Sequence, residues 1–352
     1  MAIWTWVSPA VAWVILGVTG LMGTPPVLVA IDVITLFVTV FVAVHHAEVV
    51  AHRVGEPFGT LVLAVAVTII EVALIVSVMA GSPDKASLPR DTVFAAVMIV
   101  CNGIVGLCLL VGGLRHHEQG FQLQGASSAL AVLAALTTLT MILPNVTTTI
   151  PGPMFSTPQL IFVAIVSVIL YAAFIFIQTI RHRDYFLADG ESEELHAKPP
   201  TKRTTFASAA LLCAALVAVV GLAKVLTPSV DEGIASLGMP ASLSGVIIAM
   251  LVLLPEGLAA LRAAQADRLQ TSLNLALGSS LATIGLTIPA VAAVSILYRM
   301  PLELGLDSKG MVLLALTLFL GVITLGTGRT TVLQGVVHLV NFAVFLFFAI
   351  SP

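Results

Sequence analysis

Eleven apolar runs, each about long enough to cross a membrane, restrict how this chain can fold. A helix needs about 20 apolar residues to cross a hydrocarbon core roughly 30 Å thick, and only helices and closed barrels satisfy their backbone hydrogen bonds there. We therefore predict an all-α integral membrane protein with about 11 transmembrane helices. The predicted spans are residues 6–23, 27–46, 58–80, 92–113, 125–144, 158–180, 205–226, 241–260, 271–294, 310–326 and 330–350.

The scarcity of charge excludes several classes of protein. Of the 352 residues, 59% are hydrophobic and only 9% are charged, whereas an average soluble domain carries about 25% charged residues. This composition excludes a cytosolic enzyme, a nucleic-acid-binding protein, a disordered chain and a secreted disulfide scaffold. The three cysteines lie in apolar runs without Cys-x-x-Cys spacing, so we expect neither a disulfide nor a zinc site.

The distribution of Lys and Arg predicts the orientation in the membrane, because cytoplasmic loops carry an excess of both. If the longest polar loop, residues 181–204, is cytoplasmic, ten of the 15 Lys and Arg residues fall on its side and five on the other. We therefore expect a plasma-membrane protein with its N-terminus in the cytoplasm and its C-terminus outside.

The loop 181–204 separates two units of five predicted spans. An odd number of spans makes the second unit enter the membrane from the opposite side, which gives the inverted repeat common in secondary transporters. In each unit a Gly-x-Pro sequence leads into a span with a glutamate, 14 residues after Pro57 and 16 residues after Pro240. We predict an extra N-terminal helix at 1–26, five-helix repeats at 27–180 and 205–352, and a cytoplasmic linker with an acidic segment at 181–204.

Glu71 and Glu256 are the glutamates of these two spans. A charge at the bilayer centre costs at least ~2.5–3.5 kcal/mol, so such an acid is functional by default. Burial favours the protonated carboxyl, whereas a nearby cation favours the ionised one. Protons and a cation therefore compete for the same oxygens, which predicts antiport. Oxygen ligands favour hard cations such as Ca²⁺, Mg²⁺, Mn²⁺ and Na⁺; the alternative is a structural hydrogen bond from a protonated acid.

Breaks in the helices add candidate ligands to the glutamates. Pro255 has no N–H, so the carbonyl of Leu251 loses its helical partner and becomes a candidate cation ligand. Asn102 and Ser279 occupy matching polar breaks in the spans that follow the glutamates, and we expect their side chains to contribute oxygens. The alternative for both is helix packing, in which small and polar residues are common.

Four further ionisable residues are candidates for an ion path or a pH sensor. Asp32, towards the outer end of its span, would line an external ion path, and His338 in the last span would relay protons. His45 and His46, at the cytoplasmic end of the second span, would sense internal pH. The alternative for Asp32 is a protonated structural acid, and the alternative for His338 is a structural hydrogen bond. The alternative for His45 and His46 is an interfacial belt at the helix end.

Two stretches of the sequence carry a family resemblance. Residues 45–60, which lead into the Glu71 span, and residues 254–258 with 272–279 resemble the bacterial ChaA-type calcium/proton (sodium-potassium/proton) antiporters of the cation/calcium exchanger superfamily. Relatives in the wider superfamily carry a Gly-Asn-Ala/Thr-x-Glu pattern, but here residues 67–70 and 252–255 lack the side-chain amide. Ligand geometry and ion preference of the calcium-selective members therefore do not carry over.

The resemblance implies a fold with an extra helix and two inverted five-helix repeats. It also implies that Glu71 and Glu256 bind both the cation (Ca²⁺, Na⁺ or K⁺) and the protons, and that the protein lies in the bacterial inner membrane. An acidic segment often joins the repeats in this group, and Glu191, Glu193 and Glu194 stand in that place.

An intramembrane enzyme and an ion channel are the alternative functions. A metalloprotease needs His-Glu-x-x-His on a helix, and the nearest string, residues 116–121, lies in a loop and lacks the second histidine. Channels usually build their filters by rotational symmetry between subunits, whereas an internal inverted repeat favours alternating access. We predict a cation/proton antiporter, not an enzyme, whose partners are small cations, protons and the lipid bilayer but no nucleic acid. We also expect no cofactor, only a transported cation and protons.

Overall fold

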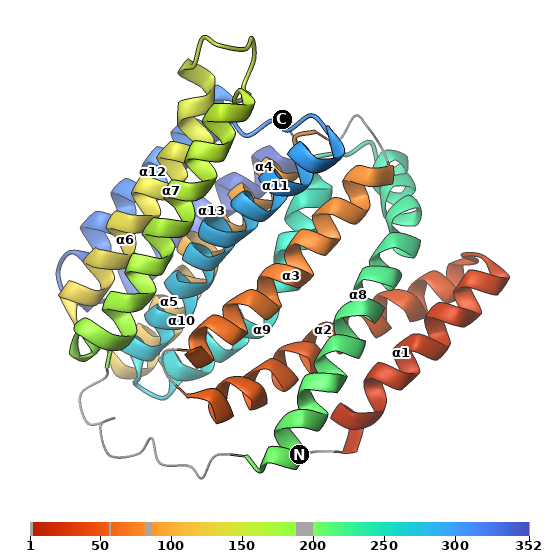
Figure 1. Ribbon diagram of the computed structural model, residues 1–352. Helices are drawn as coiled ribbons and strands as arrows, with labels where there is room; N and C mark the ends of the chain where they lie inside the picture. Colours follow the sequence, from red (N-terminus) through yellow and green to blue (C-terminus); the bar gives the residue numbers. More distant parts are fainter. Residues whose placement is uncertain (1–2, 56–57, 82–85, 188–199, 352) are drawn as a thin grey trace. The chain divides into compact units, whose positions relative to one another are not determined.

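The computed structural model describes residues 3–55, 58–81, 86–187 and 200–351, which are nearly all helical (Figure 1). Within these ranges, 11 helical spans are long and apolar enough to cross a membrane, which confirms the predicted number and the all-α class. The acidic residues Glu191, Glu193 and Glu194 lie outside the described residues.

The spans agree with the predicted centres but differ at their ends. The second helix extends past residue 46 to Val54 and stops at Gly55, whose φ of 77° suits glycine. The seventh continues through Pro228 to Ser236 and so includes Asp231 and Glu232, beyond the predicted end at residue 226. Hydropathy shows where the apolar residues of a span stop. A helix ends only where its backbone hydrogen bonding ends, so the observed helices include polar residues beyond the predicted spans.

Close contacts divide the chain into two compact units. Unit 1 comprises residues 1–85 and 197–244, and unit 2 comprises residues 86–196 and 245–352. Each unit takes helices from both halves of the sequence, so the units are distinct from the predicted repeats. The boundaries of the repeats stay a prediction.

Unit 1 contains four long helices: α1 (Ile3–Met22), α2 (Pro26–Val54), α3 (Phe58–Gly81) and α8 (Lys202–Ser236). Helix α2 packs against the other three, and α8 also packs against α1 and α3. The indole N–H of Trp13 on α1 donates to the carbonyl oxygen of Ala214 on α8 at 3.1 Å. A Cβ atom at Gly221 of α8 would come within 2.5 Å of Leu16, so a glycine allows this close approach.

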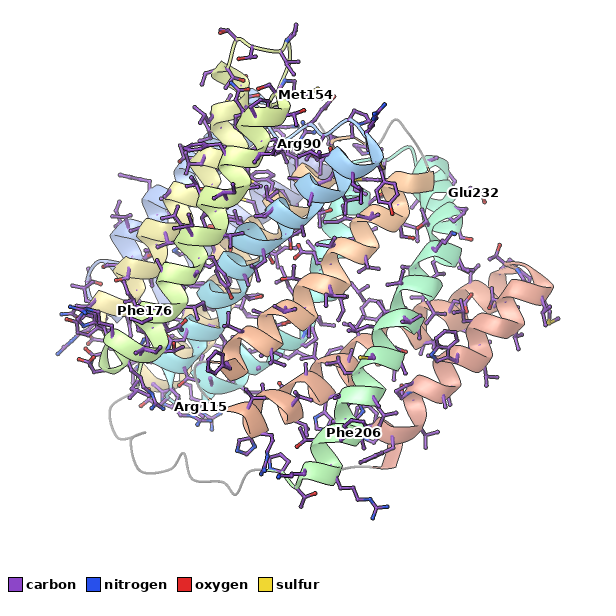
Figure 2. The ribbon with its side chains drawn as sticks, in the orientation of Figure 1. Arg90, Arg115, Met154, Phe176, Phe206 and Glu232 are labelled. Atoms are coloured by element: carbon purple, nitrogen blue, oxygen red, sulfur yellow. The ribbon has the colours of Figure 1, made fainter. Side chains whose placement is uncertain are left out.

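Unit 2 contains the other spans and a short β-ribbon, in which β1 (Gln119–Gly120) pairs antiparallel with β2 (Arg329–Thr330). Figure 2 shows Arg90 and Arg115 at opposite ends of its first span. The remaining elements are α4 (Leu88–Met98), η2 (Ile99–Ile104), α5 (Val105–His116), α6 (Leu123–Thr137), η3 (Thr138–Ile142), η4 (Leu143–Val146), α7 (Thr157–Phe176), η5 (Ile177–Arg181), η6 (Arg183–Phe186), α9 (Leu243–Gln265), α10 (Leu269–Ala282), η7 (Thr283–Thr287), α11 (Ile288–Tyr298), α12 (Ser308–Leu325) and α13 (Val332–Ile350).

Four spans of unit 2 change to π-helix for about one turn, at η2, η3, η5 and η7. Such segments are rare and are frequently found at functional sites. Two of them, η2 and η7, lie in the third span of each predicted repeat. These are the spans in which the sequence shows polar breaks: Asn102 lies within η2, whereas Ser279 lies in α10, just before η7.

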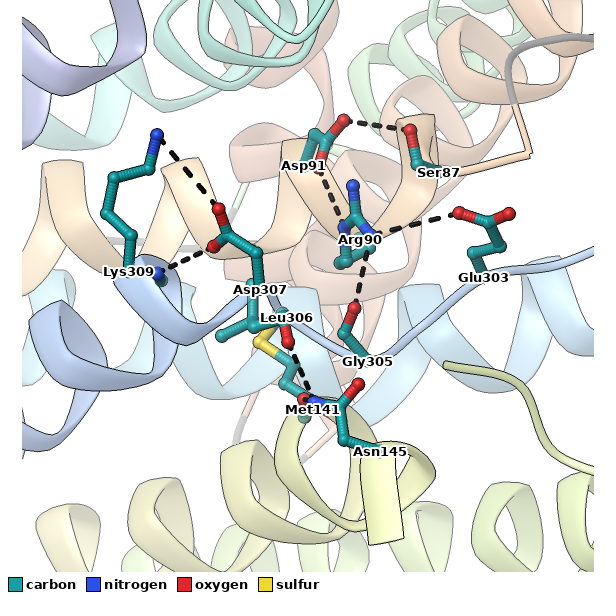
Figure 3. Close-up of polar contacts among 11 residues, drawn as sticks. Ser87, Arg90, Asp91, Met141, Asn145, Glu303, Gly305, Leu306, Asp307 and Lys309 are labelled. Atoms are coloured by element: carbon teal, nitrogen blue, oxygen red, sulfur yellow. Dashed lines mark hydrogen bonds and ion pairs between the residues drawn. The ribbon is translucent and has the colours of Figure 1, made fainter. Parts of the chain in front are cut away.

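A charged cluster at one end of unit 2 holds the segment between α11 and α12 (Figure 3). The Arg90 guanidinium pairs with Asp91 (Nε to Oδ1, 2.8 Å) and donates to the carbonyl oxygen of Gly305 at 3.1 Å. Its Nη1 also lies 3.9 Å from Oε2 of Glu303. The Ser87 hydroxyl donates to the second oxygen of Asp91 at 3.1 Å. One arginine thus ties α4 to a segment more than 200 residues later.

Side chains of the same segment alternate between the interior and this cluster. Leu302, Leu304 and Leu306 are buried, whereas Glu303 and the Gly305 carbonyl meet Arg90. The segment is therefore fixed by apolar burial on one side and by charge on the other.

We expect Arg90→Met to lower the free energy of unfolding by about 1–3 kcal/mol, because it leaves the mostly buried Asp91 without its cation. Lys309→Met is the matched control: its ion pair with Asp307 is 4.0 Å long and largely exposed, so its loss should cost about 1 kcal/mol or less. Denaturant unfolding in detergent, followed by circular dichroism, measures both. Equal losses for the two variants would contradict the role given to Arg90.

Candidate functional site

Glu71 is buried near the middle of α3. It is the fourteenth of the 24 residues of this helix, which places it about 15–20 Å from either end at 1.5 Å per residue. The side chain is 2% exposed, and the neighbouring Ile70 and Leu74 are equally buried. This carboxyl therefore lies near the middle of its helix, as the sequence predicts.

Glu256 occupies the same position in α9, where it is the fourteenth of 23 residues. Its side chain is half-buried. The helix continues through Pro255, so the carbonyl of the buried Leu251 lacks the N–H that a helix would normally supply. The matching positions of the two glutamates support the predicted correspondence between their helices.

Small residues bring α9 close to the span that contains Asn102. A Cβ atom at Gly257 would lie 3.0 Å from the side chain of Ile104, at the end of η2. Farther along, Cys108 of α5 forms a buried cluster with Ala260 and Ala264 of α9. Small residues let transmembrane helices approach closely, and here they hold the Glu256 helix beside η2.

The two polar breaks predicted from the sequence are neighbours in unit 2. Segment η2 packs against α10, and the side chain of Cys101 contacts that of Ser280. Farther along the two spans, Cys108 contacts Ser272. Residue numbers rise along one span as they fall along the other, so the spans are antiparallel. Ser279 is half-buried beside this contact.

Asn102 is the centre of a buried hydrogen-bond network that joins η2 to α12 and α13. Its amide nitrogen donates to the Thr317 hydroxyl at 2.9 Å, and its amide oxygen accepts from Asn341 Nδ2 at 3.1 Å. Nδ1 of His338 lies 3.2 Å from the same oxygen and must donate, because an amide oxygen only accepts. Nε2 of His338 lies 2.8 Å from the Thr324 hydroxyl. All five side chains are at most 4% exposed.

This network defines what Asn102 and His338 do in the conformation described. The Asn102 oxygen already holds two N–H donors, so a cation would have to displace one of them. Both ring nitrogens of His338 have hydrogen-bond partners, as expected if this histidine makes structural hydrogen bonds instead of relaying protons. Cation binding by Asn102 and proton relay by His338 stay predictions.

The other residues singled out in the sequence lie in unit 1. Asp32 is fully buried and accepts a hydrogen bond from the Thr19 hydroxyl of α1 at 3.0 Å. His46 is also fully buried, with Nε2 at 2.9 Å from the carbonyl oxygen of Thr5. His45, by contrast, is about one-third exposed. Asp32 and His46 thus both lie between α1 and α2, near opposite ends of the pair.

Sequence reasoning missed the roles of Thr317, Thr324 and Thr19. A threonine in an apolar span gives little signal, because its hydroxyl can bond to its own helix. Thr317 does so as well, donating to the carbonyl oxygen of Leu313 at 2.7 Å. Only the packing of α12 against η2 shows that its oxygen also accepts from Asn102.

Comparison with known proteins identifies relatives along nearly the whole chain. The family described as sodium/calcium exchanger protein matches residues 24–180 and 207–351. The protein y4hA of Sinorhizobium fredii is 50% identical, over 99% of this chain and 96% of its own. The sodium-potassium/proton antiporter ChaA of Escherichia coli is 36% identical, over 97% and 94%. The solved structure of native YfkE matches with a TM-score of 0.77 and 17% identity, covering 99% of this chain and 100% of YfkE.

We expect Asn341→Leu to lower the free energy of unfolding by about 1–3 kcal/mol, because it takes one N–H donor from the buried oxygen of Asn102. Thr140→Val is the matched control, since the hydroxyl of this buried threonine bonds only within its own helix and its loss should cost about 1 kcal/mol or less. Chemical unfolding in detergent provides the comparison. If the asparagine variant were as stable as the control, the network would not contribute as described.

Proposed function

Because the chain belongs to the sodium/calcium exchanger protein family, whose members are membrane transporters, we propose that it exchanges Ca²⁺ or Na⁺ (K⁺) for protons by alternating access. Its relatives are transporters, which confirms the prediction that it is not an enzyme. The sodium-potassium/proton antiporter at 36% identity supports protons as the counter-ion and monovalent cations among the cargo. The proposed location is the bacterial inner membrane, with the N-terminus in the cytoplasm and the C-terminus outside.

The matching positions of Glu71 and Glu256 are the observation that carries this proposal. Each is the fourteenth residue of its helix, and a carboxyl at that depth requires a compensating proton or cation. In the proposed mechanism the two glutamates share one cation, and protons replace it when it leaves. The predicted inverted repeat would supply the two symmetric halves of an alternating-access cycle.

The charge on the two carboxylates sets which loaded states can move. Two carboxylates carry two negative charges, which are neutralised by two protons, by one divalent cation, or by one monovalent cation and one proton. A doubly charged empty site is costly to move through a low-dielectric interior. Exchange is therefore coupled, because only a neutral site completes the cycle.

Further oxygens complete the proposed cation site. The Leu251 carbonyl, left without a helical donor by Pro255, and the Ser279 hydroxyl would act as neutral ligands beside Glu256. Asn102 would act as a ligand by exchanging one of its two N–H partners for the cation. Hard cations with oxygen ligands suit such a set.

The first test measures exchange in proteoliposomes under an imposed pH gradient, with Ca²⁺, Na⁺ and K⁺ supplied in turn. We expect proton-coupled flux of at least one of these cations, and we expect Glu71→Gln and Glu256→Gln to reduce it to the level of protein-free vesicles. Glu118→Gln is the matched control, since this half-exposed carboxylate pairs with Arg329 at 3.5 Å. Unchanged flux in either Glu71→Gln or Glu256→Gln would rule out the proposed mechanism.

The second test concerns the Leu251 carbonyl. Pro255→Ala restores an N–H that bonds to this carbonyl, so we expect a higher KM for the cation. We also expect the free energy of unfolding to rise by up to about 3 kcal/mol. Flux at varied cation concentration and denaturant unfolding measure the two effects. A more stable variant with an unchanged KM would remove this carbonyl from the proposed site.

A further inference from the structure

Two polar contacts join α1 to α2 in unit 1, between Thr19 and Asp32 and between the Thr5 carbonyl and His46. The buried residues of α1 include Thr5, Ser8 and Thr19, whereas its large apolar side chains, such as Trp4 and Leu21, are exposed. This arrangement is the reverse of a soluble amphipathic helix and is typical of helices that hydrogen-bond to each other in lipid. The buried polar residues of α2 are Asp32, Thr35, Thr39 and His46.

Asp32 is the acid in this polar contact. Its side chain is 0% exposed, and Oδ1 lies 3.0 Å from the Thr19 hydroxyl. Within the residues that the structure describes, the second oxygen, Oδ2, is buried and has no hydrogen-bond partner. An ionised carboxylate would therefore carry part of its charge on an oxygen that accepts no hydrogen bond from the described residues.

The Thr19 hydroxyl has a single hydrogen to donate, so its hydrogen bonds differ between the ionised and the protonated Asp32. This oxygen lies 3.1 Å from the carbonyl of Ile15 as well as 3.0 Å from Asp32. If Asp32 is ionised, Thr19 must donate to it and leave the Ile15 carbonyl. If Asp32 carries a proton on Oδ1, it donates to Thr19, and Thr19 donates to Ile15. Both hydrogen bonds then form, so the geometry favours the protonated acid.

Within the described parts of unit 1, no ion pair involves Asp32, although helices α1, α3 and α8 pack against α2. Residues 3–22 of α1 include none that titrates, and His45, the nearest titratable residue on α2, is about 20 Å away along the helix. The other titratable residues of these helices are Glu71 on α3, His46, Glu48, His52 and Arg53 on α2, and Lys202, Arg203, Cys213, Lys224, Asp231 and Glu232 on α8.

We propose that Asp32, with Thr19, is a proton-binding site of the α1–α2 contact, separate from Glu71 and Glu256. The proton is bound at neutral pH and holds the two helices together; its release leaves an uncompensated buried carboxylate that loosens them. Asp32 lies about 9 Å from the start of α2 at Pro26, and Thr19 is three residues from the end of α1. Both groups of the site therefore lie near helix ends. This site goes beyond the proposed exchange, since its proton need not be transported.

Infrared spectroscopy of the purified protein at neutral pH tests whether the proton is present. We expect a band from a protonated carboxyl that shifts when aspartate alone is labelled with ¹³C, which distinguishes it from any glutamate. The band should disappear in Asp32→Asn and remain in the matched control Thr35→Val, which removes a buried hydroxyl of α2 that bonds to the Ile31 carbonyl of its own helix. The labelled wild-type protein gives a result even if the variant does not fold. A wild-type spectrum without a label-sensitive protonated band would overturn the proposal.

The pH dependence of unfolding tests whether the proton holds α1 against α2. An unfolded aspartate is ionised above about pH 4, so folding takes up one proton if Asp32 is protonated. Stability must then fall as pH rises from about 4 to the pH at which the folded Asp32 ionises, by a factor of up to about 10 per pH unit in the folding equilibrium, and this contribution levels off above that pH. Asp32→Asn should lose this dependence and Thr35→Val should keep it. Identical pH dependences in wild type and Asp32→Asn would contradict the proposal; neither experiment depends on transport.

Discussion

A carboxyl group inside a membrane must hold a proton, hold a cation or leave the low-dielectric region, and this constraint governs the chemistry of the chain. Glu71, Glu256 and Asp32 all lie within spans. Glu71 and Glu256 lie at matching mid-helix positions, where we propose that a cation and protons exchange. Asp32 lies near a helix end, where we propose that a retained proton is structural.

The same constraint explains the neutral polar groups of unit 2. Lipid offers no hydrogen bonds, so each buried polar side chain must find a partner within the protein. Asn102 meets this requirement through partners on two other spans, Thr317 on α12 and both His338 and Asn341 on α13. A network of this kind fixes the relative positions of three helices, and it does so at a π-helical turn beside the Glu256 helix. The network thereby fixes the position of the π-helical turn next to the proposed cation site.

The sequence was sufficient for the number of spans and for the depth of Glu71, because both follow from the exclusion of charge from hydrocarbon. It was insufficient for helix ends, as the extension of α2 to Val54 illustrates, because helix hydrogen bonding continues beyond the apolar segment. It also could not identify the partners of Asn102, since a contact between residues 102 and 317 depends on packing rather than on local pattern. The Arg90 cluster was missed for the same reason, since two of its partners, Glu303 and the Gly305 carbonyl, lie more than 200 residues away.

Competition between protons and a cation for the same carboxylates is the central claim, and proton release on cation binding tests it most directly. Purified protein in weakly buffered detergent would be mixed with Ca²⁺, Na⁺ or K⁺ while a pH indicator records released protons and calorimetry records binding. We predict that each cation that binds releases protons, and that the double variant Glu71→Gln and Glu256→Gln releases none. Cation binding without proton release in the wild-type protein would contradict the account.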